Sequence, residues 1–346
     1  MVVLSALPLL LAIPATVSAW TIKNLVTFGD SYTDQSRLGY WYANSTAPPP
    51  HYSELYPPLG FAANGGANWV RYAELYGKLK AYNYAVSGAA CSNLLTGRPG
   101  VGPPAYKDGD FPSIKEYEIG AFATDHISKV KGKSSNDLPA DDTVYSVWIG
   151  TNDVGFGSLL TGNQTAGVTI VNVTECVIDW MESIYAYGGR NFVFQNMIPL
   201  QLTPLYSVNP GPLTRYWPYA HNRTQYAIEI SELVAAGNAL WNLQVPAALS
   251  KLPGAKAAIF DSHQLFTDMY YSPSKYLNGS KPLNVTGYVA VSNITGGDTV
   301  VAKNPDSFLW YDALHPSEQA SRIVAQEIVK TVQGTSKYAT YFNGKF

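Results

Sequence analysis

The chain has 346 residues with a net charge of −2, and hydrophobic residues make up 46% of it. Only 14% of the residues are charged, whereas about 25% are charged in an average soluble protein. This composition supplies enough apolar side chains for one large core. It excludes a basic nucleic-acid-binding protein and a highly charged disordered chain.

The first 19 residues predict a signal peptide. Their apolar run is interrupted by Pro8 and Pro14 and ends in Val17-Ser18-Ala19, a small-residue pattern that suits cleavage by signal peptidase. Because no basic residue precedes the run, a buried N-terminal helix remains the alternative. No later segment has 18 uninterrupted apolar residues. We therefore expect a secreted, extracellular protein without a transmembrane helix, in which residues 20–346 form a single domain with loop insertions.

Short apolar runs alternate with segments of helical periodicity along the rest of the chain. The runs predict strands over residues 24–28, 82–86, 143–149, 191–196 and 257–260. The periodic segments predict helices over residues 68–79, 113–130, 174–187, 224–249 and 317–332. This alternation is typical of βαβ units, so the predicted fold is α/β, a three-layer α/β/α sandwich with a five-stranded parallel sheet. Insertions rich in Pro, Gly and Tyr interrupt it at residues 39–66, 97–112, 199–220 and 272–307.

A candidate nucleophile follows the first strand. Ser31 lies in Gly29-Asp30-Ser31-Tyr32, just past the strand end, where the functional groups of such sheets gather. Gly29 permits a tight turn, and free backbone N–H groups near Ser31 would stabilise the anion that forms when a serine attacks a carbonyl. On these residues alone, a simple turn with a helix-capping serine is equally well supported.

The segment before the last helix supplies partners for Ser31. Asp312 stands three residues before His315, a spacing that lets the carboxylate bind one ring nitrogen while the other takes a proton from the serine. Asp261 and His263 are the competing pair, but they are only two residues apart. The remaining histidines lack an acidic residue three positions upstream, and we interpret them as structural or surface residues; they are His51, His126 and His221.

Two more strand ends carry candidate hydrogen-bond donors. Gly88 follows the second strand, and Asn152 follows the strand that ends at Ile149. The N–H groups of Ser31 and Gly88 and the side-chain amide of Asn152 would together form a three-donor oxyanion hole. Taken singly, each segment is more typical of an ordinary turn.

These segments, in this order, resemble the four sequence blocks of the GDSL esterases of the SGNH hydrolase superfamily, over residues 24–330. The residues that match are Ser31, Gly88, Asn152, and Asp312 with His315. The surrounding sequence is most similar to fungal enzymes of carbohydrate esterase family 16. This resemblance implies a flavodoxin-like SGNH hydrolase fold and acetylesterase activity on acetylated plant-wall sugars. Tyr32 stands where the family's name has leucine, beyond the nucleophile, and we expect it to disturb neither the triad nor the hole.

Two cysteines and a set of Asn-x-Ser/Thr sequons agree with secretion. In an oxidising compartment, Cys91 and Cys176 predict one disulfide, with two buried free thiols as the alternative. Glycans would supply the solubility that the few charged side chains lack. The seven sequons are at Asn44, Asn163, Asn172, Asn222, Asn278, Asn284 and Asn293.

We therefore expect a secreted serine esterase that hydrolyses short-chain acetyl esters of plant cell-wall saccharides. A lipase or phospholipase of the same superfamily is the first alternative, and a non-catalytic secreted sugar-binding protein is the second. Aromatic stretches at residues 40–42 and 216–219 suit a sugar face, although glycosylated surface loops explain them nearly as well. We expect no metal or other cofactor, since His-Glu-x-x-His is absent. The expected partner is a small-molecule or oligosaccharide ester substrate. We expect no binding to nucleic acid or to a membrane, and we expect a monomer.

Overall fold

The structure is a computed structural model that describes residues 22–54, 62–98, 102–103, 106, 110–130, 133–209, 211–292, 294–295 and 299–346. The predicted signal peptide, residues 1–19, and the sequon at Asn293 lie outside the described residues.

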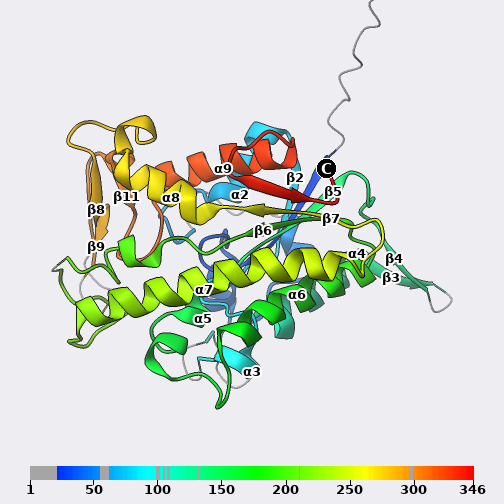
Figure 1. Ribbon diagram of the computed structural model, residues 1–346, viewed down its shortest axis with the longest axis horizontal. Coiled ribbons are helices and arrows are strands. Elements are labelled where there is room, and N and C mark those ends of the chain that lie inside the picture. Colours follow the sequence, from blue (N-terminus) through cyan, green and yellow to red (C-terminus); the bar gives the residue numbers. More distant parts are fainter. Residues whose placement is uncertain are drawn as a thin grey trace, which may run out of the picture.

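A six-stranded sheet forms the centre of the molecule (Figure 1). In spatial order its strands are β12 (Ala339–Phe342), β7 (Lys256–Phe260), β6 (Asn191–Gln195), β5 (Thr143–Trp148), β1 (Asn24–Gly29) and β2 (Lys80–Asn83). All neighbours are parallel except β12, which runs antiparallel to β7. Every residue of β5 and nearly every residue of β1 is buried, as expected for parallel strands covered on both faces.

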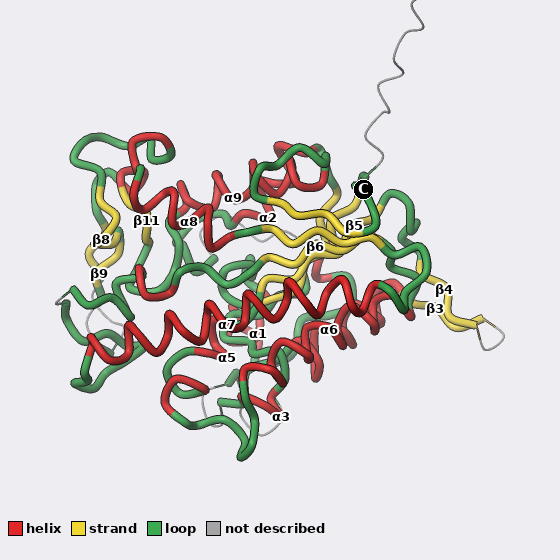
Figure 2. Tube along the Cα trace, in the orientation of Figure 1, coloured by secondary structure: helices red, strands yellow, loops and turns green. Residues whose placement is uncertain are grey.

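Helices cover both faces of the sheet, which gives the predicted three-layer sandwich (Figures 1 and 2). One layer holds α2 (Trp69–Gly77), α8 (Ser262–Tyr271) and α9 (Glu318–Val332), with α2 packed on α9. The other holds α4 (Ile119–His126), α6 (Ile170–Ala186) and α7 (Arg223–Leu249), with α6 packed on α7. The shorter helices are α1 (Arg37–Asn44), α3 (Asn93–Thr96) and α5 (Thr151–Val154).

Small elements lie in and beside the insertions. Three two-stranded pairs are formed by β3 (Ile127–Val130) with β4 (Lys133–Asn136), β8 (Asn284–Tyr288) with β11 (Phe308–Trp310), and β9 (Ala290–Val291) with β10 (Val300–Val301). Single 3₁₀ turns cover Tyr52–Glu54, Leu159–Thr161, Leu200–Leu202, Pro273–Lys275 and Pro305–Ser307. Among the described residues, no helix combines the length and apolar character needed to cross a membrane.

The fold differs from the sequence prediction in several features. The strand predicted over residues 82–86 is displaced, since β2 covers Lys80–Asn83. The sixth strand, β12, was not predicted, because its four residues form a strand only by pairing with β7, about 80 positions earlier. The helix predicted over residues 113–130 is wrong in part. A π-helical turn at Ile114–Glu118 precedes α4, and the chain after His126 turns into the β3–β4 hairpin. The spacing of apolar residues could not predict this hairpin. Its second strand lies beyond residue 130, where the predicted helix ends, and the hydrogen bonds between the two strands leave no periodic pattern within the first.

The structure contains a disulfide between Cys91 and Cys176, which confirms the predicted pairing. It joins the loop after β2 to the buried side of α6. The loop that carries Gly88 is therefore fixed to the layer of helices that contains α6.

Candidate active site

The turn after β1 presents Ser31 at the carboxyl end of the sheet. Gly29 has a φ of +146°, and a Cβ there would lie 2.2 Å from the carbonyl oxygen of Trp148 on the neighbouring strand. Only glycine fits this close approach. Beyond it, the carbonyl of Asp30 accepts the N–H groups of Thr33 and Asp34 at 3.0 and 2.9 Å. This turn leaves Ser31 half-buried, with its side chain free to meet a partner.

His315 and Asp312 lie beside Ser31, as the sequence predicts. The Nε2 atom of His315 is 2.8 Å from the Oγ of Ser31. Its Nδ1 atom is 2.9 and 3.0 Å from the two carboxylate oxygens of Asp312. Because an ionised carboxylate only accepts, Nδ1 carries the ring proton and Nε2 is left to accept the serine proton.

The Asp312 carboxylate is strongly held in its ionised form. Its Oδ1 atom accepts the backbone N–H groups of Leu314 and His315 at 2.9 and 2.8 Å. Burial alone would raise the pKa of Asp312. The charge of His315 and the hydrogen bonds from His315 and Tyr216 outweigh burial and lower this pKa to about 2.

A cavity of 320 Å³ opens over the serine and contains all three predicted oxyanion donors, Ser31, Gly88 and Asn152. Among the described residues, no acceptor takes the backbone N–H of Ser31 or Gly88. The Asn152 amide donates one hydrogen to the carbonyl of Ala89 at 2.9 Å, and its Oδ1 accepts from Arg98 at 3.1 Å. These two contacts fix the amide and leave its second hydrogen for a ligand.

Two buried aspartates that the sequence prediction left without a role join the loops of the site. Asp34 accepts both the N–H and the hydroxyl of Ser87 at 2.8 Å, which ties the Ser31 turn to the Gly88 loop. Asp153 accepts the N–H of Cys91 at 3.0 Å and the hydroxyl of Thr96 at 2.6 Å. Burial raises the pKa of Asp153 to about 6. The sequence offered one signal for these two aspartates, namely that they lie close to Ser31 and Asn152 in the chain.

Two tyrosines contact the triad, although neither was predicted to. The ring of Tyr32 packs edge-on against His315 with centroids 5.9 Å apart, and its hydroxyl donates to the carbonyl of Leu314 at 3.1 Å. The hydroxyl of Tyr216 donates to Oδ2 of Asp312 at 2.6 Å. Tyr32 therefore supports the loop that carries His315, while the 2.8 Å contact between His315 and Ser31 is intact.

Asp261, from the competing pair, and two of the histidines interpreted as structural have other partners. Asp261 caps α8, where it accepts the N–H of Gln264 at 3.0 Å and the amide of Asn196 at 2.9 Å. His126 is buried and lies 2.7 Å from Asp137, and His221 stacks on Trp217 with centroids 3.8 Å apart.

The interpretation of residues 40–42 and 216–219 as sugar-facing is wrong for their tryptophans. Trp41 is buried against Tyr106 and Tyr117. Trp217 is buried in a stack with Phe156. Both rings are packed against other aromatic side chains, so neither is available to a sugar face. From the first stretch, Tyr42 is half exposed and lines the cavity.

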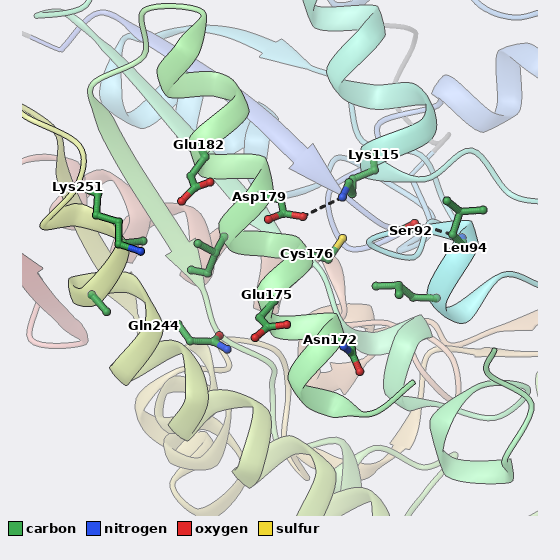
Figure 3. A pocket seen from close by; sticks show the side chains of 14 residues that line it. Ser92, Leu94, Lys115, Asn172, Glu175, Cys176, Asp179, Glu182, Gln244 and Lys251 are labelled. Carbon is green, nitrogen blue, oxygen red and sulfur yellow. Dashed lines mark hydrogen bonds and ion pairs between the residues drawn. The ribbon is translucent and has the colours of Figure 1, made fainter. Parts of the chain in front are cut away.

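A second hollow, of 510 Å³, lies between α6 and α7 and is larger than the cavity at Ser31 (Figure 3). Lys115 and Asp179 form an ion pair of 2.8 Å across it. No histidine lines it, and the described residues hold no cluster of three or more His, Cys, Asp or Glu suited to a metal ion. We therefore assign the active site to the smaller cavity.

A serine, a histidine and a carboxylate joined in a chain at the strand ends of an α/β sandwich have the arrangement of a serine hydrolase. A sequence profile of the GDSL-like lipase/acylhydrolase family matches residues 25–328, and the chain belongs to this family. It is a carboxylic ester hydrolase, which removes the non-catalytic sugar-binding alternative.

Relatives cover almost the whole chain. An acetylesterase of Hypocrea jecorina is 36% identical over 92% of this chain and 91% of that protein. An acetylesterase of Thermothelomyces thermophilus is 26% identical over 90% and 89% of the two chains. Among solved structures, the acetylxylan esterase Axe2 of Geobacillus stearothermophilus aligns with a TM-score of 0.40 and 14% identity, over 90% of this chain and 95% of that one. A similarity this low carries no weight, so the assignment rests on the sequence relatives.

Proposed function

We propose that the protein is a serine acetylesterase whose nucleophile is Ser31. The observation that carries this proposal is the unbroken chain from the Oγ of Ser31 through His315 to Asp312, with contacts of 2.8 and 2.9 Å. His315 takes the Ser31 proton as Oγ attacks the ester carbonyl. It then returns the proton to the leaving alcohol, and a water molecule repeats the sequence to release the acid.

The negative charge that develops on the carbonyl oxygen is held by the N–H groups of Ser31 and Gly88 and by the Asn152 amide. Neither backbone N–H has an acceptor within the part of the chain that the structure describes, so both can bind the transition state without breaking an existing bond. Arg98 contributes indirectly, because its hydrogen bond to Oδ1 of Asn152 keeps the amide nitrogen turned towards the cavity.

The acyl group is acetyl, and the alcohol is a saccharide of the plant cell wall. Two relatives over most of the chain are acetylesterases. Polar groups interrupt the apolar part of the cavity wall, among them Arg98, Asn152 and Arg215. Each buried CH₂ of a long acyl chain yields about 0.8 kcal/mol only where an apolar trough receives it. Because guanidinium and amide groups interrupt this wall, a long acyl chain would not gain that burial free energy here.

We further propose that the protein is a secreted glycoprotein. Residues 1–19 are a signal peptide, residues 20–346 are one SGNH hydrolase domain, and the enzyme is secreted as a monomer. The sequons at Asn44, Asn163, Asn222 and Asn278 have exposed side chains, which is compatible with glycans. The Cys91–Cys176 disulfide suits the same oxidising compartment.

The test is a series of p-nitrophenyl esters from acetate to palmitate, compared by kcat/KM, with acetate release from acetylated xylo- and gluco-oligosaccharides measured alongside. We expect a maximum at acetate and a fall of more than tenfold by octanoate. A maximum at octanoate or longer would favour a lipase, the activity suggested by an Arabidopsis thaliana relative described as a GDSL esterase/lipase. Cleavage of the aryl acetate without release from any saccharide would contradict the saccharide substrate alone.

A further inference from the structure

The insertion at residues 199–220 places two side chains against the acidic end of the triad. Tyr216 is 96 positions from Asp312 in the chain, yet its hydroxyl lies 2.6 Å from Oδ2 of that carboxylate. The Tyr216 ring also packs against His315, with centroids 5.5 Å apart. Arg215 donates from Nη2 to the Tyr216 oxygen at 2.6 Å, and the same nitrogen is 3.9 Å from Oδ2 of Asp312.

These contacts fix the direction of the Tyr216 hydroxyl proton. A guanidinium only donates, so the phenol oxygen accepts from Arg215 and must point its own proton elsewhere. Oδ2 of Asp312 is the near acceptor, since Nδ1 of His315 is 3.3 Å away and itself directs a proton at the carboxylate. Burial, reinforced by the charge of Asp312, raises the pKa of Tyr216 well above its ordinary value, so the phenol keeps this proton.

We propose that Tyr216 is a positioning residue for ester hydrolysis, held by Arg215, which fixes the Asp312 carboxylate so that His315 stays aimed at Ser31. This inference rests on the proposed function. Two backbone N–H groups already hold Oδ1 of Asp312. Without Tyr216, the imidazole would be the one hydrogen-bond donor that the described residues offer to Oδ2. The carboxylate could then rotate about its bond to Cβ. The predicted consequence is a histidine that meets the serine less often in the reactive geometry.

The pH dependence separates this role from simple packing. The phenol and the guanidinium both compensate charge on Asp312, so removing either one leaves more of that charge to stabilise a protonated imidazole. The acid limb of kcat/KM should therefore move to higher pH. Four other titratable groups interact with Asp312 or His315, and all four stay unchanged in the variants below. They are Asp30, Tyr32, Tyr288 and Tyr311.

The experiment compares Tyr216→Phe and Arg215→Gln with wild type and with Tyr271→Phe, which removes an exposed hydroxyl on α8. For Tyr216→Phe we expect kcat for p-nitrophenyl acetate to fall about tenfold, as for loss of one hydrogen bond to a charged group. We expect KM to stay within about twofold. Phosphonylation of the enzyme by an aryl phosphonate, which reports serine activation without substrate turnover, should slow by the same factor. The acid limb should move up in both variants, and Tyr271→Phe should match wild type.

Wild-type kcat, or a fall in kcat with an unmoved acid limb, would overturn the inference for a folded Tyr216→Phe protein. Should that variant fail to fold, Arg215→Gln decides alone, because half of the Arg215 side chain is exposed and its loss leaves the core intact. A Ser31→Ala protein tested in parallel separates the two proposals. If Ser31→Ala retains activity, the proposed function fails. If Ser31→Ala is inactive while Tyr216→Phe has the activity of wild type, only the role of Tyr216 is contradicted.

Discussion

The cavity over Ser31 and the groove between α6 and α7 show what distinguishes an active site from a hollow. The groove is the larger, at 510 Å³ against 320 Å³. Most of its charged side chains lie on α6, namely Glu175, Asp179 and Glu182 (Figure 3). Within the described part of the chain, Glu175 and Glu182 make no hydrogen bond or ion pair there. The cavity instead collects side chains from the ends of several strands and from the insertions.

The difference lies in how the polar groups are constrained. At Ser31, each functional group is held by a second one: Arg98 holds Asn152, Asp34 holds the Gly88 loop, and Tyr216 holds Asp312. In the groove, Lys115 and Asp179 form an exposed ion pair, and such pairs contribute little. Preorganised contacts therefore identify the site better than volume does. The disulfide connects the two regions, since Cys176 lies at the groove and Cys91 follows the Gly88 loop.

The largest expected contrast is between one substitution in each region. Ser31→Ala should remove esterase activity by at least about 10³-fold with the fold intact, because no other group supplies the nucleophile. Glu175→Gln in the groove should leave kcat/KM unchanged. Initial rates with p-nitrophenyl acetate and circular dichroism of both proteins test this. More than a few per cent of activity in a folded Ser31→Ala protein would place the nucleophile elsewhere.

Removing one oxyanion donor should have the next largest effect. Asn152→Ala should lower kcat by roughly 10²–10³, the range for loss of a single such donor, with little change in KM. The matched control is Gln244→Ala, which removes an amide from the groove instead. Equal kcat values for Asn152→Ala and wild type would show that Asn152 only shapes the loop through Ala89.

The link between the two regions should matter more for stability than for catalysis. The Cys91–Cys176 disulfide spans 85 positions, and loop entropy sets an upper limit of about 4–5 kcal/mol on its contribution. A Cys91→Ser/Cys176→Ser protein should therefore unfold at a lower urea concentration while it retains most of its kcat at 25 °C. Urea titrations followed by tryptophan fluorescence measure this. Two titratable thiols in the unfolded, non-reduced wild-type protein would contradict the disulfide itself.

The smallest expected effect concerns the acidic groups under the cavity. Burial raises the pKa of Asp30 to about 7 and that of Asp153 to about 6. A carboxyl group with a raised pKa in the folded state binds more protons there than in the unfolded state. The free energy of unfolding should therefore decrease as pH rises from about 4 to about 7. Asp312, with its pKa lowered to about 2, has the opposite effect, and its contribution is lost as pH falls from about 4 to about 2.

The combined contribution of these three carboxyl groups to stability should accordingly be greatest near pH 4, and Asp30→Asn should flatten the decrease between pH 4 and 7. Urea midpoints measured across this range for wild type and Asp30→Asn test the sign. Parallel curves for the two proteins would mean that folding does not raise the pKa of Asp30. Glu175→Gln in the groove should leave the curve unchanged, because that carboxylate is exposed.

Local patterns in the sequence were enough to predict the framework of the site. The strands at residues 24–28, 143–149, 191–196 and 257–260 were predicted within a few residues. The reason is that a parallel strand buried on both faces needs a continuous apolar run. The predicted strand at residues 82–86 lies partly beyond β2, yet its last residues still bond to β1, since Val86 donates to the carbonyl of Gly29. Strand ends then placed Ser31, Gly88 and Asn152 at one edge, and the Asp-x-x-His spacing paired Asp312 with His315.

Only the tertiary structure determined what supports these groups. Tyr216 and Arg215 belong to an insertion whose sequence suggested a sugar surface, and their contact with Asp312 depends on how that insertion folds back over the sheet. Trp217 of the same insertion, and Trp41 of the insertion at residues 39–66, are buried instead of facing a sugar. Period and spacing describe residues within about one element of each other. Hydrogen bonds between segments a hundred positions apart are determined by packing, and these long-range bonds hold the catalytic groups in place.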